Sequence, residues 1–354
     1  MTLTHIRAEN VRCLTEIHLD PADSNLIYGE NASGKTSLLE AIFILGRARS
    51  FRTANRETVI RDGQSEMMVA GTIQSGEREV PLGIGLTVGK PPRIRLDGKE
   101  ETSVAALAQW LPVQIIDPEI HQLVDQGPAI RRKFVDWGVF HVEPRFLDAW
   151  RRYHRCLRQR NAALKASALG QLEAWDQELS VAGQELSSYR RDYIGALQEY
   201  VKAIGSSVLD AEPQVTYRQG WPEGKSLIDA LMDARDRDIK YRQTHVGSHR
   251  SDLSVSLDQR EARGRVSRGQ QKLLAATLVL AQLACLRREI GREAILLLDD
   301  LAAELDRDRL ERLRAVIEPL KLQLFMTALR ESDLRRWNFG RVFHVEQGKV
   351  RSVV

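Results

Sequence analysis

The stretch that decides the fold is Gly29-Glu30-Asn31-Ala32-Ser33-Gly34-Lys35-Thr36. It fits the pattern G-x-x-x-x-G-K-[ST] in full, with an apolar run at 25–28 before it and a helical pattern after it. Glycines let the backbone curl so that its N–H groups face an anion, and the N-terminus of the helix adds partial positive charge. This stretch, called the phosphate loop below, therefore predicts a phosphate site between a strand and a helix.

The side chains of the phosphate loop have separate expected parts. Lys35 is predicted to contact the β- and γ-phosphates of ATP, and Thr36 to bind Mg²⁺. The predicted ATP-binding residues are Gly29, Glu30, Asn31, Ala32, Ser33, Gly34, Lys35, Thr36 and Ser37.

A second apolar strand, expected at 295–298, ends in two carboxylates, Asp299 and Asp300. Ligands bind at the carboxyl ends of strands in α/β sheets, so both side chains are candidates for chemistry. We predict that Asp299 holds Mg²⁺ through its water shell and that Asp300 orients or deprotonates the attacking water. Together with Lys35, they form the predicted catalytic group.

The distance along the chain between these two motifs predicts the domain organisation. Lys35 and Asp299 are 264 positions apart, whereas a small-molecule kinase would place its acidic strand much closer. A large lobe must therefore be inserted between two halves of one sheet. We predict one ATPase lobe from residues 1–127, which include an antiparallel meander at 66–97, and from 291–354. The charged, helical-patterned 128–290 is predicted to form the inserted lobe.

A third motif, Ser267-Arg268-Gly269-Gln270, precedes an apolar helix expected at 271–286. A hydroxyl and a glycine at a helix N-terminus form an anion site, although an ordinary helix cap has the same appearance. We call these four residues the signature segment. Their position about thirty residues before the acidic strand favours the anion site.

The charge distribution favours a polyanionic partner without proving one. The net charge is only +4, but 41 of the 52 basic residues are arginine, which suits phosphate contacts; high genomic GC content would also enrich arginine. Basic residues dominate 47–61 and 131–165, as in a DNA-backbone surface or a solvated helix face. The residues predicted to contact DNA are Arg49, Arg52, Arg131, Arg132, Lys133, Arg151 and Arg152.

Other features argue against secretion and membrane insertion. No run approaches the roughly 18 apolar residues of a membrane span, and the first ten residues lack the apolar core of a signal peptide. The three cysteines are far apart and suit a reducing compartment. We therefore expect a cytoplasmic, nucleoid-associated protein with no membrane partner.

The order of phosphate loop, signature segment, acidic strand and Glu304-Leu305-Asp306 resembles the ABC-type ATPases of chromosome maintenance, and most closely the bacterial RecF family. The chain lacks the long coiled coil of the chromosome-condensing proteins. The resemblance implies an α/β fold, an ABC-type P-loop ATPase head with a mixed sheet lobe and an inserted helical lobe. Further matching segments are residues 49–52, 131–136, 159–161 and 298–306.

The resemblance also implies how the motifs work together. ATP would lie between two subunits, with Lys35 and Thr36 of one copy facing the signature segment of the other. Asp306 would lie along the dimer seam. Gln114 joins the predicted catalytic residues as the candidate for the glutamine that senses Mg²⁺ and links the lobes.

The sequence departs from the family patterns at three positions. Asp300 stands where most ABC ATPases have Glu, which implies slow hydrolysis, although RecF-like proteins share this residue. Thr327 replaces the switch histidine of many ABC ATPases. Ser248, in the segment 247–253, replaces a proline that is usual in the RecF family.

The activity implied by the resemblance is a weak, DNA-stimulated ATPase that uses ATP and Mg²⁺. It would form a homodimer on ATP binding, bind duplex DNA or junctions of single- and double-stranded DNA, and act in replication, the SOS response to DNA damage and recombinational repair. Its implied partners are RecO and RecR, which load RecA. Two alternatives stay open: a nucleotide-binding subunit of another ABC system, such as a membrane transporter, and a scaffold in which ATP only holds a dimer together.

Overall fold

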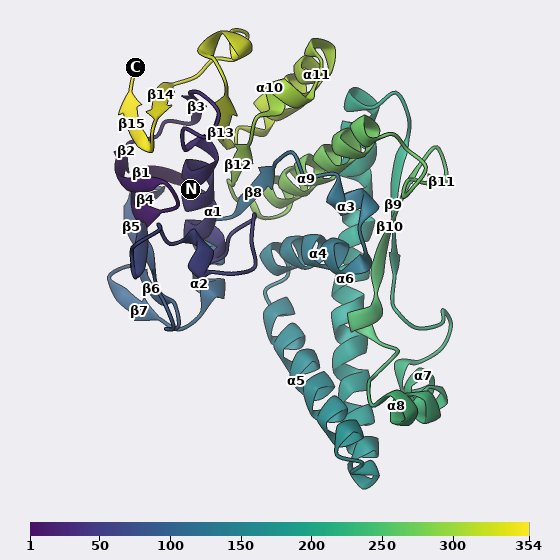
Figure 1. Ribbon diagram of the computed structural model, residues 1–354. Helices are drawn as coiled ribbons and strands as arrows, with labels where there is room; N and C mark the ends of the chain where they lie inside the picture. The colour runs from purple at the N-terminus through teal and green to yellow at the C-terminus, as the bar shows by residue number, and fades with distance from the viewer. Residues whose placement is uncertain (354) are drawn as a thin grey trace. The chain divides into compact units, whose positions relative to one another are not determined.

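The computed structural model describes residues 1–353, which divide into two compact units (Figure 1). Unit 1 contains residues 1–120 together with the chain from Ile290 on, and unit 2 contains His121–Glu289. The chain passes into unit 2 after residue 120, where the sequence suggested 127, and leaves it after residue 289, where the sequence suggested 290.

Unit 1 is built around a sheet that combines strands from both parts of the chain. Its strand order is β15-β14-β3-β13-β12-β8, and all neighbours are parallel except β14 and β15. Every residue of β12 is buried, as expected for a strand covered on both faces. The strands are β3 (Ser24–Tyr28), β8 (Val113–Ile116), β12 (Ile295–Leu298), β13 (Gln323–Ala328), β14 (Arg341–Glu346) and β15 (Lys349–Ser352).

The second sheet of unit 1 is antiparallel, with the order β2-β1-β4-β5-β6-β7. Alternate residues of β5 are buried, which confirms the meander predicted from the period of two in this region. The strands are β1 (Thr2–Val11), β2 (Leu14–Leu19), β4 (Glu66–Ser75), β5 (Arg78–Thr87), β6 (Arg93–Leu96) and β7 (Lys99–Glu101).

Helix α1 (Lys35–Arg47) contributes one continuous row of buried residues to the core of unit 1. Gly46 does not end this helix: α1 continues to Arg47 and is capped by Ala48, which has a left-handed φ of 49°. A Cβ at Gly46 would come within 2.6 Å of the Leu111 carbonyl oxygen, so this glycine permits close packing instead. The other helices of unit 1 are α2 (Val104–Trp110), α10 (Leu301–Glu304) and α11 (Arg307–Ile317), with short 3-10 turns at Glu57–Val59, Glu318–Leu320 and Glu331–Leu334.

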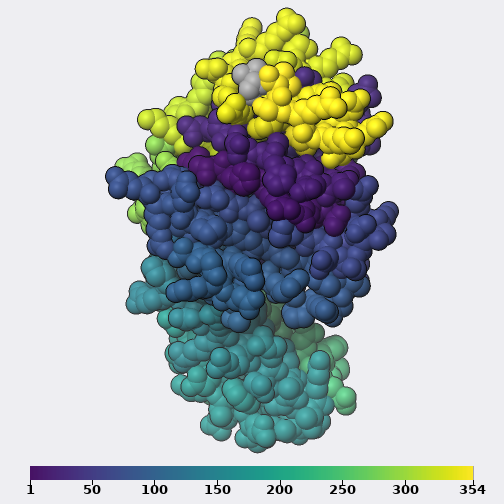
Figure 2. Space-filling view, turned by 90° about the vertical axis from the view of Figure 1, so that its left-hand side faces the viewer, coloured from purple at the N-terminus to yellow at the C-terminus, as the bar shows by residue number. Residues whose placement is uncertain are grey.

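The N-terminal and C-terminal strands of unit 1 lie side by side. The β14–β15 hairpin turns at Gln347 and Gly348, both with positive φ. Strand β15 contacts β2, and Figure 2 shows the yellow C-terminal residues against the purple N-terminal ones.

Unit 2 is mainly helical, and two of its long helices, α5 and α6, pack along each other (Figure 1). It also contains a three-stranded antiparallel sheet, β11-β10-β9, which the prediction of a helical lobe at 128–290 missed because its strands are short. The helices are α3 (Gln122–Asp125), α4 (Pro128–Val142), α5 (Phe146–Lys165), α6 (Leu172–Val208), α7 (Leu227–Asp233), α8 (Arg235–Tyr241) and α9 (Arg268–Ile290), with 3-10 turns at Leu169–Gln171 and Ser248–Arg250 (η3). The strands are β9 (Pro213–Arg218), β10 (Asp252–Leu257) and β11 (Arg260–Glu261).

In the part of the chain that the structure describes, no helix combines the length and apolar character needed to cross a bilayer.

Candidate nucleotide-binding site

The phosphate loop connects β3 to α1, and its backbone adopts the conformations that glycine favours. Gly29 has a φ of 156° and Gly34 a φ of 118°, while Ala32 is left-handed at 63°. A Cβ at Gly29 would lie 2.2 Å from the carbonyl oxygen of Val345 in β14. The loop can therefore curl only because glycine occupies its first position.

The curled loop has the features of an anion cradle. Helix α1 begins without a side-chain cap, so the N–H groups of its first turn have no side-chain acceptor. Within residues 1–353, the hydroxyl of Ser33 is a buried polar group with no hydrogen-bond partner. Lys35 Nζ donates to the carbonyl oxygens of Gly29 (2.7 Å) and Glu30 (2.9 Å). These donors fit the phosphates of a nucleotide.

The outer rim of the loop is open, whereas its base is enclosed. Glu30, Asn31 and Ala32 are exposed, while Lys35 and Ser37 are buried. Burial lowers the pKa of Lys35, although the carboxylates of Asp300 and Asp299 act in the opposite direction. A cation held in this way is ready to exchange its carbonyl partners for a stronger anionic one.

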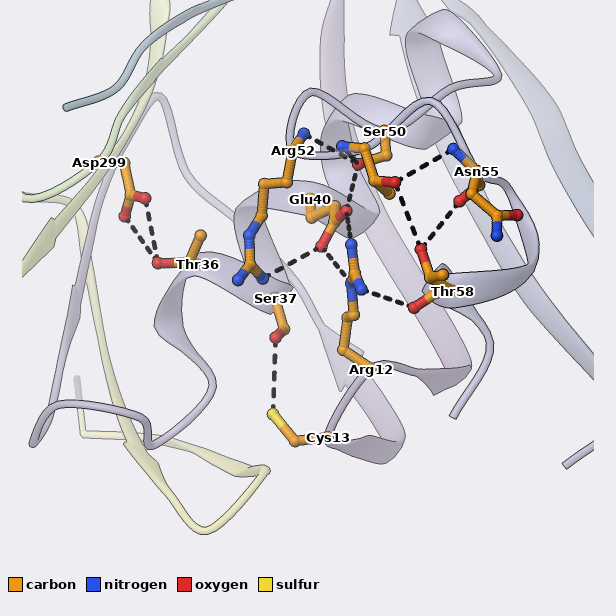
Figure 3. A network of polar contacts seen from close by, with 11 residues as sticks. Arg12, Cys13, Thr36, Ser37, Glu40, Ser50, Arg52, Asn55, Thr58 and Asp299 are labelled. Carbon is orange, nitrogen blue, oxygen red and sulfur yellow. Dashed lines mark hydrogen bonds and ion pairs between the residues drawn. The ribbon is translucent and has the colours of Figure 1, made fainter. Parts of the chain in front are cut away.

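The predicted metal ligands lie next to each other. Thr36 Oγ1 is 3.1 Å and 3.0 Å from the two carboxylate oxygens of Asp299, which follows β12 (Figure 3). Burial raises the pKa of Asp299, while its hydrogen bonds from Thr327 and Thr36 lower it. The hydroxyl of Thr36 and the buried carboxylate of Asp299 are ligands that would hold a magnesium ion beside the phosphate loop.

Thr327, at the position of the switch histidine, connects the carboxylate of Asp299 to the backbone of Asp300. It is fully buried at the end of β13, and its hydroxyl donates to Asp299 Oδ1 at 2.8 Å. The same hydroxyl accepts a hydrogen bond from the backbone N–H of Asp300 at 2.7 Å. Asp300 has a left-handed φ of 53°, which is unusual for a residue other than glycine and typical of functional sites.

A carboxylate that the sequence interpretation missed, Asp117, stands at the same edge of the sheet. Strand β8 pairs with β12 in parallel, with Ile116 opposite Leu298, so that Asp117 and Asp299 follow neighbouring strands. Burial, and then the charge of Asp299, raises the pKa of Asp117 to about 6. Its sequence signal was the same as that of Asp299, an acidic residue directly after an apolar strand.

Gln114 lies inside β8, opposite Leu296, and is buried. It precedes Asp117 at the sheet edge by three positions, or about 10 Å of strand. Its proposed part in sensing Mg²⁺ stays a prediction.

The raised pKa of Asp117 predicts a pH-dependent stability. The folded protein binds this proton more tightly than the unfolded chain, so stability is lost as the pH rises from the ordinary value of 3.8 through about 6. Asp117→Asn should remove that loss, which amounts to up to about 3 kcal/mol. Urea unfolding in EDTA at pH 4 and pH 7 measures it. Parallel pH profiles for wild type and variant would contradict the assignment.

A second buried network surrounds Glu40, which lies one turn along α1 from Thr36 (Figure 3). Glu40 is fully buried and accepts two hydrogen bonds from Arg12, each of 2.9 Å. It also accepts a hydrogen bond from Ser50, and Arg52 lies 3.5 Å from it. This carboxylate therefore ties the β1–β2 turn and the segment after α1 to the helix that carries Lys35.

The signature segment begins α9 in unit 2. The backbone N–H of Ser267 donates to the side chain of Gln270 at 3.0 Å, and the N–H of Gln270 donates to Ser267 Oγ at 3.3 Å. This reciprocal pair is a capping box. Ser267 and Arg268 are exposed and Gly269 is half-buried, so the helix N-terminus is accessible to an anion.

Asp306 caps another helix. It is exposed, and its carboxylate accepts a hydrogen bond of 2.9 Å from the backbone N–H of Arg309 at the start of α11. Its proposed place along a dimer seam stays a prediction.

The structure separates the predicted DNA contacts into accessible and buried residues. Arg49 and Arg52 in unit 1, and Lys133, Arg151 and Arg152 in unit 2, are exposed.

Arg132 is half-buried and donates to the Ser251 carbonyl oxygen at 2.7 Å. Arg131 is only 4% exposed and holds both carboxylate oxygens of Asp252, at 2.8 Å and 2.9 Å. The prediction that Arg131 contacts DNA is therefore wrong, because its guanidinium is occupied inside unit 2.

Replacing Arg131 should lower the free energy of unfolding. Arg131→Gln leaves Asp252 without its partner, and breaking such a pair costs about 3–5 kcal/mol. Urea unfolding measures the loss, and Lys133→Gln, which changes an exposed cation two residues away, is the matched control. A variant as stable as wild type but with weaker DNA binding would contradict the correction.

The segment 247–253 is also part of the unit 2 interior. Arg190 donates to the carbonyl oxygen of Ser248 at 2.7 Å and to the hydroxyl of Ser251 at 3.1 Å. Ser248 is fully buried and its hydroxyl donates to the Gly183 carbonyl oxygen at 2.6 Å, which accounts for a serine in place of the usual proline. Arg160, counted among the basic residues of 131–165, is likewise fully buried, between Asp176 and Asp238.

Comparison with known proteins finds a matching family and close relatives over nearly the whole chain. The family model described as the RecF/RecN/SMC N terminal domain matches residues 2–351. The DNA replication and repair protein RecF of Pseudomonas aeruginosa strain LESB58 is 39% identical over 359 aligned residues, covering 99% of this chain and 97% of the relative. RecF of Azotobacter vinelandii is also 39% identical, with 99% and 98% covered.

Solved structures show the same fold. The recombination mediator protein RecF with ATP, described as part of the RecFOR pathway, superposes with a TM-score of 0.91 at 26% identity, over 99% of this chain and 97% of that one. An Smc head domain from Pyrococcus furiosus, at 14% identity and a TM-score of 0.59 over 99% and 95%, shares the ABC-type ATPase fold. In sequence over nearly its whole length and in fold, this chain belongs to the RecF family.

Proposed function

We propose that this protein is an ATP-dependent DNA-binding protein of recombinational repair and replication maintenance. The observation that carries the proposal is the phosphate loop in unit 1, with Lys35 inside it and Thr36 against Asp299. Two likenesses support it: the relatives are named DNA replication and repair proteins, and the RecF structure that superposes on this chain is a complex with ATP.

In the proposed mechanism, backbone N–H groups at the start of α1 and the Lys35 ammonium bind the phosphates. Magnesium, held by Thr36 and Asp299, would neutralise charge that develops on the phosphoryl group. Asp300 orients the attacking water and accepts its proton, while Thr327 holds the backbone of Asp300 in place. Because aspartate is shorter than glutamate by one methylene group, we expect hydrolysis to be slow. The likeness to RecF leads us to expect that DNA stimulates it.

A homodimer would complete the site. The exposed N-terminus of α9, with Ser267 and Gly269, is suited to meet the γ-phosphate bound to a second copy. In this arrangement Asp306 lies along the seam between the copies.

We propose DNA contacts from the accessible cations Arg49, Arg52, Lys133, Arg151 and Arg152, and a weaker one from the half-buried Arg132. DNA at a gap or a junction of single and double strands would be held while ATP is bound and released on hydrolysis. The structural relative is described as a mediator in the RecFOR pathway, which supports RecO and RecR as partners, and RecA as the protein they load.

Ser267→Arg tests the proposed pairing of subunits. The variant should bind ATP as wild type does, because the phosphate loop is unchanged, but a bulky cation at the tip of α9 should prevent ATP-dependent dimers. Sedimentation velocity with and without ATP, and with duplex, gapped or single-stranded DNA, measures both states. Asp258→Arg, at an exposed turn in the same unit, is the control. ATP-dependent dimers of the Ser267 variant would contradict the arrangement.

A further inference from the structure

The outer face of the antiparallel sheet in unit 1 carries an open cavity of about 610 Å³. It lies over β4 and β5 on the side away from the core, with β1 and β6 as its two walls. These walls are three strand spacings apart, or about 14 Å. We call this cavity the β groove. Its volume is that of a binding cleft, for which ~300–1,000 Å³ is typical.

The floor of the β groove is made of small residues. Ala70 of β4 lies opposite Gly83 of β5, and Gly85 follows Gly83 on the same face. Neither glycine is needed for the packing of the chain itself. A Cβ at Gly83 would come no closer than 3.5 Å to its neighbours, and one at Gly85 no closer than 3.8 Å. Both distances are those of ordinary contact between side chains.

Glycine at these two positions also serves no conformational purpose, since neither residue has a positive φ. By contrast, Gly71 in β4 points to the core, where a Cβ would come within 2.8 Å of the His5 carbonyl oxygen. Glycine inside a strand weakens it, and often marks a place where a ligand or another backbone approaches closely. Because no atom of residues 1–353 crowds Gly83 or Gly85 in this way, the close neighbour is expected in another molecule.

The charges of the walls differ between the two ends of the β groove. Arg7 of β1 and Arg95 of β6 stand on the two sides of the pair Ala70 and Gly83. The side chain of Arg95 is 73% exposed, and its ion pair with Glu100 is long, at 3.8 Å. Two cations against one carboxylate leave this end positive.

The opposite end is negative. Glu9 of β1 and Glu66 of β4 stand there against one cation, Arg93, which lies 3.7 Å from Glu66. Glu9 also contacts Arg7, so the two ends meet along the β1 wall. The β groove is therefore polar along its length, with opposite signs of charge at its two ends.

We propose that the β groove binds an α-helix of another protein, with the N-terminus of that helix at the Glu66 end. A helix with its side chains is about 10–12 Å across, which fits between walls about 14 Å apart. Its macrodipole places partial positive charge at the N-terminus and partial negative charge at the C-terminus, opposite to the charges of the two ends. Large apolar side chains at steps of three and four residues would insert over Gly83 and Gly85.

The length of the β groove sets the length of the bound helix. From Glu66 to Thr72 it extends over about 20 Å, which corresponds to about 14 helical residues. The partner is therefore a helix of about four turns with one apolar face.

Other occupants fit these observations less well. A β-strand cannot add to the floor, because β4 and β5 are each paired with strands on both sides. DNA would meet the carboxylates of Glu9, Glu66 and Glu100 together with the arginines of the walls. Binding of a helix needs neither ATP nor DNA, so the proposal does not depend on the function proposed above.

The test selects helices on the whole chain and then fills the β groove. A displayed library of helix-forming peptides of about 14 residues, with Leu, Ile, Met and Phe varied along one face, is selected on the wild type without nucleotide. Fluorescein-labelled copies of the selected peptides are then titrated with wild type and with the double variant Gly83→Thr, Gly85→Thr. The double variant should bind them at least about ten-fold more weakly by fluorescence anisotropy, because the added side chains occupy the space over the floor.

The double variant should also unfold at the same or a higher urea concentration than wild type, because threonine favours strands. Glu79→Thr is the matched control, since it adds a threonine at an exposed position of β5 outside the β groove, and it should bind the peptides as wild type does. A photoreactive group at the N-terminus of a bound peptide should crosslink near Glu66, and one at its C-terminus near Arg95. The reverse pattern would overturn the direction of the helix.

Three other results would overturn the proposal. The first is a selection that enriches no peptide, or peptides that bind wild type and double variant equally. The second is a lower urea midpoint of the double variant, which would show that the chain's own fold requires the glycines. The third is a folded double variant that has lost the ATP-dependent dimers of the wild type, which would show that the β groove contacts a second copy of the chain.

Discussion

Lys35→Ala is expected to lower the affinity for ATP by about 100-fold or more and to abolish ATP-dependent dimers with it. The ammonium of Lys35 is buried at the base of the phosphate loop and now donates to two loop carbonyls, at 2.7 Å and 2.9 Å. Each charge-assisted hydrogen bond that it would make to a phosphate contributes about 1.5–3 kcal/mol, so the loss of two accounts for this factor. Isothermal titration calorimetry with ATP and Mg²⁺ measures the affinity.

Lys321→Ala is the matched control, because Lys321 is an exposed lysine of the same unit at the end of a 3-10 turn. It should bind ATP as wild type does. Tight ATP binding by the Lys35 variant, with a normal unfolding curve, would refute the phosphate loop as the nucleotide site.

The second large effect concerns hydrolysis. Asp300→Asn should reduce ATP turnover by about 10²–10⁴-fold, because an amide cannot accept the proton of the attacking water. Nucleotide binding should persist, since Lys35, Thr36 and Asp299 are unchanged, and ATP-dependent dimers should become longer-lived. Phosphate release with and without DNA measures turnover, and sedimentation in the same buffer measures the dimers.

Asp308→Asn, an exposed carboxylate in the first turn of α11, is the control and should hydrolyse ATP normally. If the Asp300 variant hydrolyses ATP as fast as wild type, Asp300 is not the catalytic carboxylate. If wild type itself shows no turnover with DNA present, the scaffold in which ATP only holds the dimer becomes the better account.

Local sequence was sufficient for features that depend on local chemistry. The phosphate loop needs glycines and a lysine at set spacing, and the buried strand β12 needs a continuous apolar run, so both could be predicted. The two carboxylates that follow β12, Asp299 and Asp300, could be predicted for the same reason. The two motif-bearing strands, β3 and β12, were expected in one sheet, and they lie in one sheet with β13 between them.

Features that depend on long-range contacts could not be predicted. Arg131 and Lys133 are two residues apart in one basic run, yet one is buried on Asp252 and the other is exposed. Only the packing of α4 against β10 distinguishes them. The ion pair between Arg12 and Glu40 likewise joins residues from separate elements, and nothing in the sequence around either residue indicates it.

The central claim is that one triphosphate is held by the phosphate loop of one copy and the signature segment of another. Mixing two inactive variants tests it most directly. A dimer of a Lys35→Ala chain with a Ser267→Arg chain contains one intact composite site, because each chain supplies the half that the other lacks. Sedimentation with ATP should then show dimers in the mixture that neither variant forms alone. A mixture that stays monomeric at saturating ATP, while the wild type dimerises, would contradict the claim.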